Sequence, residues 1–231
     1  MIVVPALGAL VAGALTHGAF YPNSPIFGRV IAHVGHDDEP VVALTFDDGP
    51  NPEATPAILD ALAARGAKAS FFILGRHAQR WPELVRRIAS EGHLVCNHGY
   101  YHRKLHFKSP GYVRNDLRLG TEAIVEACGV RPAFFRAPHG FRSPWVTSIA
   151  RSLGQRTVGW GHGVWDTALP GVEVIAERTV RVAKPGSILL LHDGDGYDPL
   201  GNRTQTARAV PLIIDRIRDA GLEFATLEMA A

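Results

Sequence analysis

This sequence has few cysteines, almost no net charge and no periodic glycine, and each of these features excludes a class of protein. Two cysteines among 231 residues, Cys96 and Cys128, are too few for a disulfide framework; we expect two buried thiols, with a single bridge as the alternative. The 24 basic and 22 acidic residues leave a net charge of only +2, which gives no reason to expect a nucleic-acid partner. The 24 glycines follow no period, which excludes a collagen-like chain. A hydrophobic content of 46% excludes disorder and indicates one globular domain, with room for a short appendage.

Charged residues are also absent from residues 1–28. Residues 1–20 are nearly all apolar, and this length is close to the ~20 residues that a membrane-spanning helix needs. The basic start of a standard signal peptide is missing. We therefore expect residues 1–20 to be a membrane anchor or an export signal, with a packed hydrophobic element as the alternative. Residues 21–25 read as an extended linker because two prolines restrict the residues before them, and residues 29–231 form the main domain.

From Pro40 onward, short apolar runs alternate with stretches of helical periodicity. The apolar runs predict strands at residues 41–46, 69–74, 93–96, 133–136, 157–160, 187–191 and 222–227. The periodic stretches predict helices at residues 54–64, 82–90, 109–128, 144–153, 172–182 and 206–220. Strands that alternate with helices in this way indicate a parallel α/β sheet buried on both faces. An open sheet and a barrel both satisfy the pattern.

Ionisable residues follow most of the predicted strands, and the carboxyl ends of parallel strands are where α/β proteins gather reactive groups. In chain order these candidates are Asp47, Asp48, Asn97, His98, His102, Arg136, His139, Asp166, His192 and Asp193. We therefore expect their side chains to meet at one edge of the sheet and to form a site there.

The two histidines His98 and His102 are four residues apart, so on one helical turn their rings would face the same way. His106 forms a rival pair with His102, and a solvated basic loop is the plain alternative. A nearby carboxylate would complete a set of two imidazoles and one oxygen, which leaves coordination positions open for water, as in catalytic zinc sites. A metal bound there would acidify its water and polarise a carbonyl group.

Three further positions suit proton transfer. Asp47 and Asp48 can point to different sides, so that one binds a metal while the other accepts a proton; a solvated turn is the alternative. His192 is placed to be a general acid, since both its protonation states are accessible near neutral pH, or it is a buried histidine bonded to a carbonyl. Arg136 can orient a carboxylate by paired hydrogen bonds, or it forms a surface ion pair.

Taken in order, the sequence motifs of these strand ends resemble those of the polysaccharide deacetylases, the NodB-homology family of carbohydrate esterases (family 4). The motifs are TFDDGP at 45–50, NHGYYH at 97–102, RAPHG at 136–140 and LLHD at 190–193. The resemblance covers roughly residues 40–227. It implies a distorted (β/α) barrel of about seven parallel strands. It also implies hydrolysis of N-acetyl groups in a GlcNAc-containing polysaccharide or oligosaccharide, of the chitin or peptidoglycan type, with release of acetate.

The resemblance assigns metal ligation to Asp48, His98 and His102, for a divalent ion that is usually Zn²⁺ but can be Co²⁺ or another metal. It makes Asp47 the base that deprotonates the attacking water and His192 the acid that protonates the leaving nitrogen. Two further residues are positioned by the same resemblance: Arg136 pairs with the base, and Asp166 holds either the histidine or the arginine.

Substrate contacts follow from the same resemblance. The backbone N–H of His139 matches the position that stabilises the oxyanion, and Leu190 lines the pocket for the acetyl methyl group. Trp165 is a candidate cover for that pocket, and His162 a candidate substrate contact.

Several positions depart from the family pattern. Gly99 stands where Ser or Thr is usual, so a hydrogen bond that steadies the metal loop is expected to be missing. Gly163 and Thr167 stand where Asp and Trp are frequent, and His139 replaces an aromatic residue. No ligand, base or acid is lost, so we expect an active enzyme.

Three other functions fit parts of this pattern. The first is hydrolysis of another linear or cyclic amide on the same scaffold. The second is a non-haem iron oxygenase, because two histidines and one carboxylate also suit Fe(II); the tandem aspartates count against it. The third is a catalytically weak carbohydrate-binding homologue. The apolar N-terminus fits an enzyme that is exported or held at a membrane and acts outside the cytoplasm.

Overall fold

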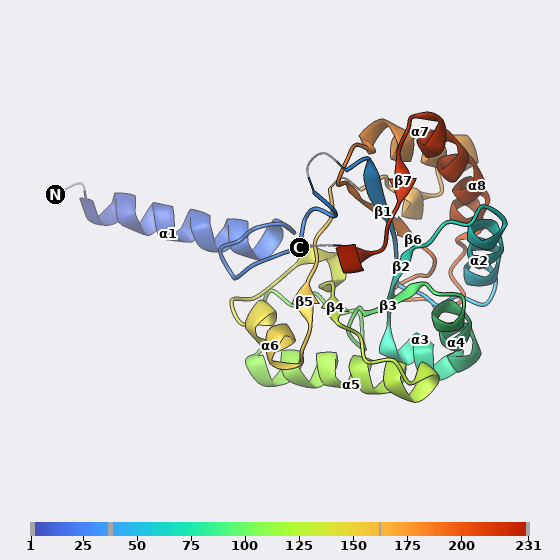
Figure 1. The fold of residues 1–231 in the computed structure, drawn as a ribbon. Helices are drawn as coiled ribbons and strands as arrows, with labels where there is room; N and C mark the ends of the chain where they lie inside the picture. The colour runs from blue at the N-terminus through green and yellow to red at the C-terminus, as the bar shows by residue number, and fades with distance from the viewer. Residues whose placement is uncertain (1–2, 37–38, 162, 230–231) are drawn as a thin grey trace.

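A curled parallel sheet surrounded by helices forms the body of the molecule, and one long helix projects away from it (Figure 1). The structure, a computed structural model, describes residues 3–36, 39–161 and 163–229, with side chains from residue 8 onward. Its strands are β1 Val41–Asp47, β2 Ser70–Ile73, β3 Leu94–Asn97, β4 Phe134–Phe135, β5 Arg156–Thr157, β6 Ile188–His192 and β7 Glu223–Phe224. Its helices are α1 Val3–Phe20, α2 Ala54–Ala64, α3 Gly75–Arg80, α4 Pro82–Ser90, α5 Pro110–Cys128, α6 Val146–Ser152, α7 Val172–Val182 and α8 Thr204–Asp219.

The strand order is β5-β4-β3-β2-β1-β6, and β7 pairs with the first residues of β1. Every pairing among these strands is parallel. An isolated parallel bridge between Gly163 and Leu190 then connects the chain beyond β5 to β6, so the sheet curls back toward itself. The predicted distorted barrel of parallel strands is confirmed, and this closure excludes the flat open sheet that periodicity alone allowed.

Alternation along β1 decides which side chains face the inside of the curled sheet. Leu44 and Phe46 are fully buried in the main core, which lies between the sheet and the helices. Ala43 and Asp47 point to the opposite, inner face because neighbouring residues of a strand alternate. The same alternation therefore packs the barrel wall and delivers a carboxylate to the interior at the carboxyl end of β1.

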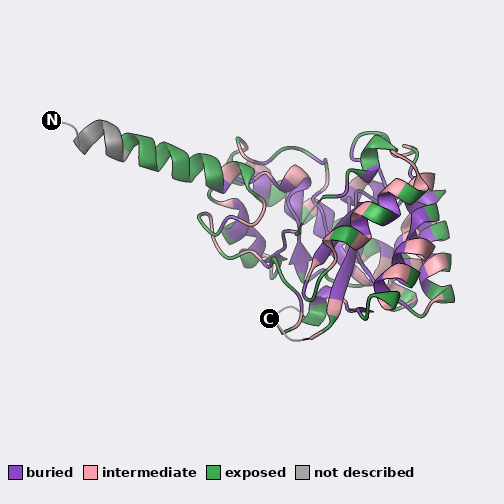
Figure 2. Ribbon diagram, turned by 90° about the horizontal axis from the view of Figure 1, so that it is seen from above, coloured by how far each residue is buried: buried purple, intermediate pink, exposed green. Residues whose placement is uncertain are grey.

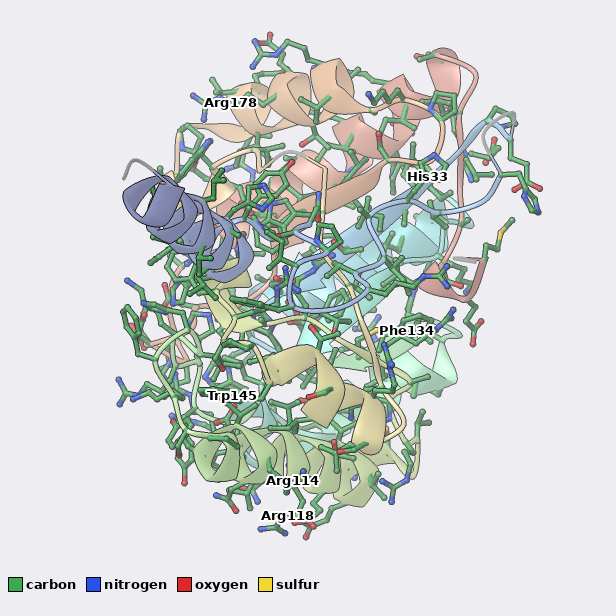
Figure 3. The ribbon with its side chains drawn as sticks, turned by 90° about the vertical axis from the view of Figure 1, so that its left-hand side faces the viewer. His33, Arg114, Arg118, Phe134, Trp145 and Arg178 are labelled. Atoms are coloured by element: carbon green, nitrogen blue, oxygen red, sulfur yellow. The ribbon has the colours of Figure 1, made fainter. Side chains whose placement is uncertain are left out.

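Helix α5 shows why the predicted helices formed where the sequence placed them. The Ser109 side chain accepts a hydrogen bond from the Tyr112 N–H at 3.3 Å, and Pro110 occupies the first turn. Gly129 ends the helix in the left-handed region at φ 76°. Just before the helix, the Lys108 carbonyl accepts a hydrogen bond from the Trp145 indole at 2.9 Å. Arg114 donates to the Ser152 hydroxyl of α6 at 3.1 Å, whereas Arg118 extends from the outer side of α5 (Figure 3).

The structure departs from the sequence-based expectations at several places. The short helix α3 directly after β2 was not predicted. Residues 98–102 form an irregular loop, the alternative to a helical turn, with positive φ at Gly99 and His102. Residues 21–25 are a succession of turns and not an extended linker, because the Ser24 N–H bonds to the Tyr21 carbonyl at 3.0 Å. Both cysteines are free, as predicted, but only Cys96 is buried and Cys128 is partly exposed.

The N-terminal helix α1 differs from the rest of the molecule in its surroundings. It is green, meaning exposed, along most of its described length, whereas the strands are largely purple (Figure 2). Leu10 and Val11 are 72% and 51% exposed. Within the described residues, no helix has the length and apolar character needed to cross a membrane. The expected anchor or signal at residues 1–20 stays a prediction.

Candidate active site

The carboxyl ends of β1, β3 and β6 meet at one end of the barrel, where they surround a cavity of about 580 Å³. Register explains the meeting, because Asp47 at the end of β1 pairs directly with His192 at the end of β6. The predicted site residues that line the cavity are Asp47, Asp48, His98, His102, His139, Trp165, Leu190 and His192. Arg136 and Asp166 are fully buried behind this lining.

Asp48, His98 and His102 form a compact cluster of candidate metal ligands. Their ligand atoms all lie within 4.8 Å of one another. The Asp48 Oδ1 atom lies 3.0 Å from His102 Nε2 and 3.3 Å from His98 Nε2. All three residues are buried, and two imidazole nitrogens with one carboxylate oxygen are the donors of a catalytic zinc-type site. The donor set therefore fits a divalent cation.

The orientation of these candidate ligands is set by backbone conformation and by hydrogen bonds to neighbouring residues. It does not depend on a helix. Asp48 adopts a left-handed conformation, φ 73°, directly after the strand, which turns its side chain away from that of Asp47. The His77 Nδ1–H donates to the Asp48 carbonyl at 2.8 Å, and the His98 Nδ1–H donates to the Arg136 carbonyl at 2.9 Å. The second bond leaves His98 Nε2 facing Asp48, which is how metal-binding histidines are usually oriented.

The electrostatics of the cluster favour a positive charge at its centre. Burial alone would raise the pKa of Asp48, but hydrogen bonds and attraction from His102 and His98 hold it well below its usual value. Burial would lower the pKa of His98, yet attraction to Asp47 and Asp48 raises it. Two carboxylates that together stabilise a buried imidazolium would stabilise a bound cation at the same place.

Asp47 is held by an arginine that the barrel fully encloses. The Arg136 Nη1–H donates to Asp47 Oδ1 at 2.6 Å and also to the Thr45 hydroxyl at 2.9 Å. The guanidinium packs against the Phe72 ring at 4.0 Å from its centroid. The hydrogen bond from Arg136 fixes Oδ1 of Asp47. The other oxygen, Oδ2, lies 3.7 Å from His98 Nε2, beside the candidate metal ligands. The alternative of a surface ion pair for Arg136 is thereby excluded.

Across the cavity, His192 is held by Asp166. The Asp166 carboxylate accepts from the His192 ring Nδ1 at 2.9 Å and from the His192 backbone N–H at 2.8 Å. The Thr206 hydroxyl donates to the same carboxylate at 2.9 Å. Burial would lower the pKa of His192, but the charges of Asp166, Asp48 and Asp47 outweigh it and raise it to about 9. These charges favour the protonated ring, and of the two partners that the resemblance offered for Asp166, the structure pairs it with the histidine.

Sequence reasoning missed Asp116 of α5, which supports the loop that carries the two histidines. Its Oδ1 accepts from the Tyr101 N–H at 3.1 Å. Gly99 has φ 78°, and a Cβ added there would collide with the Asp116 carboxylate. Gly99 lacks the side-chain hydrogen bond that Ser or Thr would make there. The hydrogen bond from the Tyr101 N–H to Asp116 of α5 steadies the loop instead. No local sequence signal marks Asp116, because its partner lies a loop and a helical turn away.

A second element that the sequence analysis missed is the loop between β6 and α8. This loop covers the cluster of candidate metal ligands. Asp195 holds this loop together by accepting from the Tyr197 N–H at 2.8 Å and from Arg203 at 2.6 Å. The Tyr197 ring lies edge-on to His102, with centroids 5.2 Å apart, and its hydroxyl lies 2.9 Å from His139 Nε2. Burial and the nearby His102 charge lower the pKa of His139 to about 4, so its ring is neutral and can share this hydrogen bond.

Comparison with known proteins agrees with this architecture. The sequence profile of the family described as polysaccharide deacetylase matches residues 35–158. The chain belongs to the polysaccharide deacetylase family. A chitooligosaccharide deacetylase of Rhizobium leguminosarum bv. trifolii is 39% identical over 84% of this chain and 92% of its own length. A peptidoglycan-N-acetylglucosamine deacetylase of Bacillus cereus is 38% identical over 83% of this chain and 88% of its own.

Among solved structures, the Bc1960 peptidoglycan N-acetylglucosamine deacetylase superposes with a TM-score of 0.79 at 33% identity, over 86% of this chain and 91% of that one. The predicted family and fold are confirmed. The roles of the individual site residues stay predictions, although the structure brings them to one cavity. Trp165 lies at its rim, 74% exposed, and Leu190 in its wall. His162 lies outside the described residues.

Proposed function

We propose that this member of the polysaccharide deacetylase family is a metal-dependent hydrolase of N-acetyl groups on GlcNAc residues of a glycan, either chitin-type or peptidoglycan. The single observation that carries the proposal is the buried Asp48, His98 and His102 cluster with Asp47 beside it and His192 opposite. Relatives named for deacetylation of these two glycans, which resemble the chain over most of its length, support the choice of substrate class.

Asp48, His98 and His102 would hold the metal, and we propose Zn²⁺ because two imidazoles and one carboxylate with open positions suit it. A divalent ion at this place supplies an acidified water and polarisation of the acetyl carbonyl. Side chains of the protein carry out the two proton transfers.

Asp47 accepts the proton of the attacking water, because its Oδ1 is fixed by Arg136 and its Oδ2 faces the metal cluster. As the carbon–nitrogen bond of the amide breaks, His192 donates a proton to the leaving nitrogen. Asp166 holds the imidazole so that Nε2 is the donating atom. One water is consumed, and acetate and a free amine on the sugar are produced.

Leu190 and Trp165 are among the apolar residues that line the cavity, and we propose that they contact the acetyl methyl group. The backbone N–H of His139 is the proposed oxyanion donor. His139 takes φ 59° between Pro138 and Gly140, a conformation that a non-glycine residue adopts only when its surroundings impose it.

Acetate release is the test. The purified protein is stripped with a chelator, restored with Zn²⁺ or Co²⁺, and assayed on chitooligosaccharides, peptidoglycan fragments, cyclic imides and small linear amides. We expect release from an N-acetylated glycan that disappears on chelation and returns with the metal. Hydrolysis of the imides or small amides alone would replace the proposed substrate class, and metal-independent release would contradict the mechanism.

The location of the enzyme is a separate proposal. We propose that it acts outside the cytoplasm and is attached to the membrane through residues 1–20. Support comes from the uncharged N-terminus and from exposed apolar side chains on α1, among them Leu10 and Leu15, which are 72% and 49% exposed.

A further inference from the structure

Residues 17–24, here named the N-terminal strap, comprise the last turn of α1 and the turn after it, and they pack against the barrel beside the cavity. A fully buried arginine, Arg142, holds the strap in place. Its guanidinium donates to the Ser24 carbonyl at 2.8 Å and to the Tyr21 carbonyl at 3.3 Å, and its backbone N–H donates to the Ala19 carbonyl at 3.1 Å. Ser24 is itself completely buried and lies 2.8 Å from the His17 ring. The strap is therefore anchored and not a spacer.

From this anchored strap, Asn23 completes the outer edge of the sheet. Strand β5 is the edge strand at one end of the sheet. The backbone groups that follow it would therefore lack hydrogen-bond partners from a neighbouring strand. Ile31 pairs with part of this edge through hydrogen bonds to Thr157 and Gly159 of 2.9 and 2.8 Å. Beyond that point the Asn23 amide donates to the Trp160 carbonyl at 2.8 Å and accepts from the Trp160 N–H at 3.2 Å.

Sequence at the contact shows how tightly the strap fits. Gly159 has no side chain, and a Cβ there would overlap the Asn23 amide oxygen. Gly140, at φ 73°, lies between Pro22 of the strap and the Trp160 ring, and a Cβ would come within 2.9 Å of Pro22. Both glycines are therefore required by close approach of the strap.

The groups that the strap touches belong to the cavity wall. Trp160 and Phe141 both line the cavity. The Phe20 ring meets the Phe141 ring edge-on, with centroids 5.2 Å apart. On the other side of the same backbone, Arg136 donates to the Gly159 carbonyl at 2.8 Å. The strap thus supports the two aromatic rings on this wall of the cavity from behind.

We infer that Asn23 is a positioning residue for the substrate: through Trp160 and Phe141, the strap holds the aromatic wall against which a sugar ring of the glycan packs. This inference rests on the proposed function for its substrate. Trp160 and Phe141 line the cavity but are not among the candidate metal ligands, base or acid. A glycan chain that fills the cavity therefore needs the wall, and a small acetyl ester that reaches only the candidate ligands and the water does not.

The test compares Asn23→Ala with Ile26→Ala, a control on the next turn of the same segment, where Ile26 is 46% exposed. Backbone hydrogen exchange of residues 157–161 is measured first, because it needs no activity. We expect faster exchange at Trp160 in the Asn23 variant only. Unchanged exchange in Asn23→Ala would overturn the inference, whatever the enzyme's substrate.

Kinetics then separate positioning from general loss of structure. For Asn23→Ala we expect KM for a chitooligosaccharide to rise at least about fivefold, from the loss of two hydrogen bonds, while kcat/KM for 4-nitrophenyl acetate stays at the wild-type value. Equal losses on both substrates, or no loss on the glycan, would contradict the role. A wild-type protein inactive on every glycan would instead refute the proposed function. Asn23→Asp, which keeps the acceptor and loses the donor, serves if the alanine variant does not fold.

Discussion

Two adjacent carboxylates, Asp47 and Asp48, have different surroundings although they are neighbours in sequence. Asp47 is the last residue of β1 and points into the barrel, where it meets Arg136 at 2.6 Å. Asp48 takes φ 73° and points to the two histidines. A strand end followed by one left-handed residue is thus sufficient to direct one carboxylate toward the two histidines and the other toward Arg136.

Substitution of each aspartate should separate these roles. Asp48→Ala removes a ligand and is expected to abolish stoichiometric zinc binding. Asp47→Asn keeps the shape and the metal but cannot accept a proton, so kcat should fall by about 10²- to 10⁴-fold. Metal content by mass spectrometry and acetate release distinguish the two. A purified Asp47→Asn enzyme that still deacetylates its glycan at the wild-type rate would refute the assignment of the base.

The ion pair between Asp166 and His192 predicts a change in pH dependence. A general acid must be protonated, so activity is lost as pH rises through its pKa. Asp166 is the strongest of the charges that raise the pKa of His192 to about 9. In Asp166→Asn that attraction is gone, the pKa falls, and the alkaline limb of kcat against pH should move to lower pH by roughly 1–3 units.

Both enzymes must be compared with the same metal bound, because a cation in the site also lowers the pKa of His192. Glu173→Gln, which changes an exposed carboxylate paired with Arg216, is the control and should leave the limb in place. An unmoved alkaline limb in Asp166→Asn would show that a different group is titrating.

At the scale of elements, the loop 98–102 depends on α5. Gly99→Ser adds a side chain at φ 78° against the Asp116 carboxylate, and Asp116→Ala removes the acceptor of the Tyr101 N–H. Each change should weaken zinc binding by about 10- to 100-fold, the range for residues that orient metal ligands. In the double variant the collision is absent, so the combined loss should be smaller than the sum of the two.

Competition with a chromophoric chelator measures these affinities. Gly111→Ser, at an exposed position in α5 where a Cβ meets nothing within 4 Å, is the control. Additive losses in the double variant would mean that Gly99 and Asp116 support the metal loop separately.

Elements that depend on local sequence were predictable, and contacts between distant segments were not. The capped helix α5 and the buried strands β1 and β6 follow from periodicity, caps and apolar runs. The strand ends also indicated most of the site, since parallel strands bring Asp47 and His192 together. The His98–His102 spacing would place both rings on one side of a helical turn, but these residues lie in an irregular loop whose left-handed residues bring the rings together. The two rings are close, as the spacing suggested, without the helical turn.

The remaining features arise from pairings that no local pattern encodes. Asp116 meets a loop 15 residues earlier in the chain, and Asn23 meets Trp160 across 137 residues. The prolines near Asn23 favoured an extended linker, but burial of Ser24 and the hydrogen bonds from Arg142 outweigh that preference. Tertiary contacts determine the conformation of such segments. The sequence alone therefore predicted a linker where the structure has part of the strap.

At the scale of the whole molecule, the strap joins the cavity end of the barrel to an exposed helix. The candidate site residues lie at one end of the barrel, while α1 projects from the same chain with apolar side chains in solvent (Figure 1). Because the strap contacts the cavity wall and begins at residue 17 of α1, removal of residues 1–16 should leave the barrel intact, whereas removal of residues 1–28 should not.

Membrane attachment gives the last prediction. Covering the uncharged α1 with lipid would remove exposed side chains such as Leu10 and Leu15 from water, a gain of about 25 cal/mol per Å² of apolar surface. The full-length chain, expressed with a C-terminal tag, should sediment with membranes, and the chain lacking residues 1–16 should remain in the supernatant with wild-type kcat/KM. Leu10→Arg places a charge in the apolar segment, where lipid would cover it at a cost in free energy, and should shift the full-length chain toward the supernatant. A full-length chain found wholly in the soluble intracellular fraction would contradict attachment, while the exchange and kinetic tests of the strap would stand unaffected.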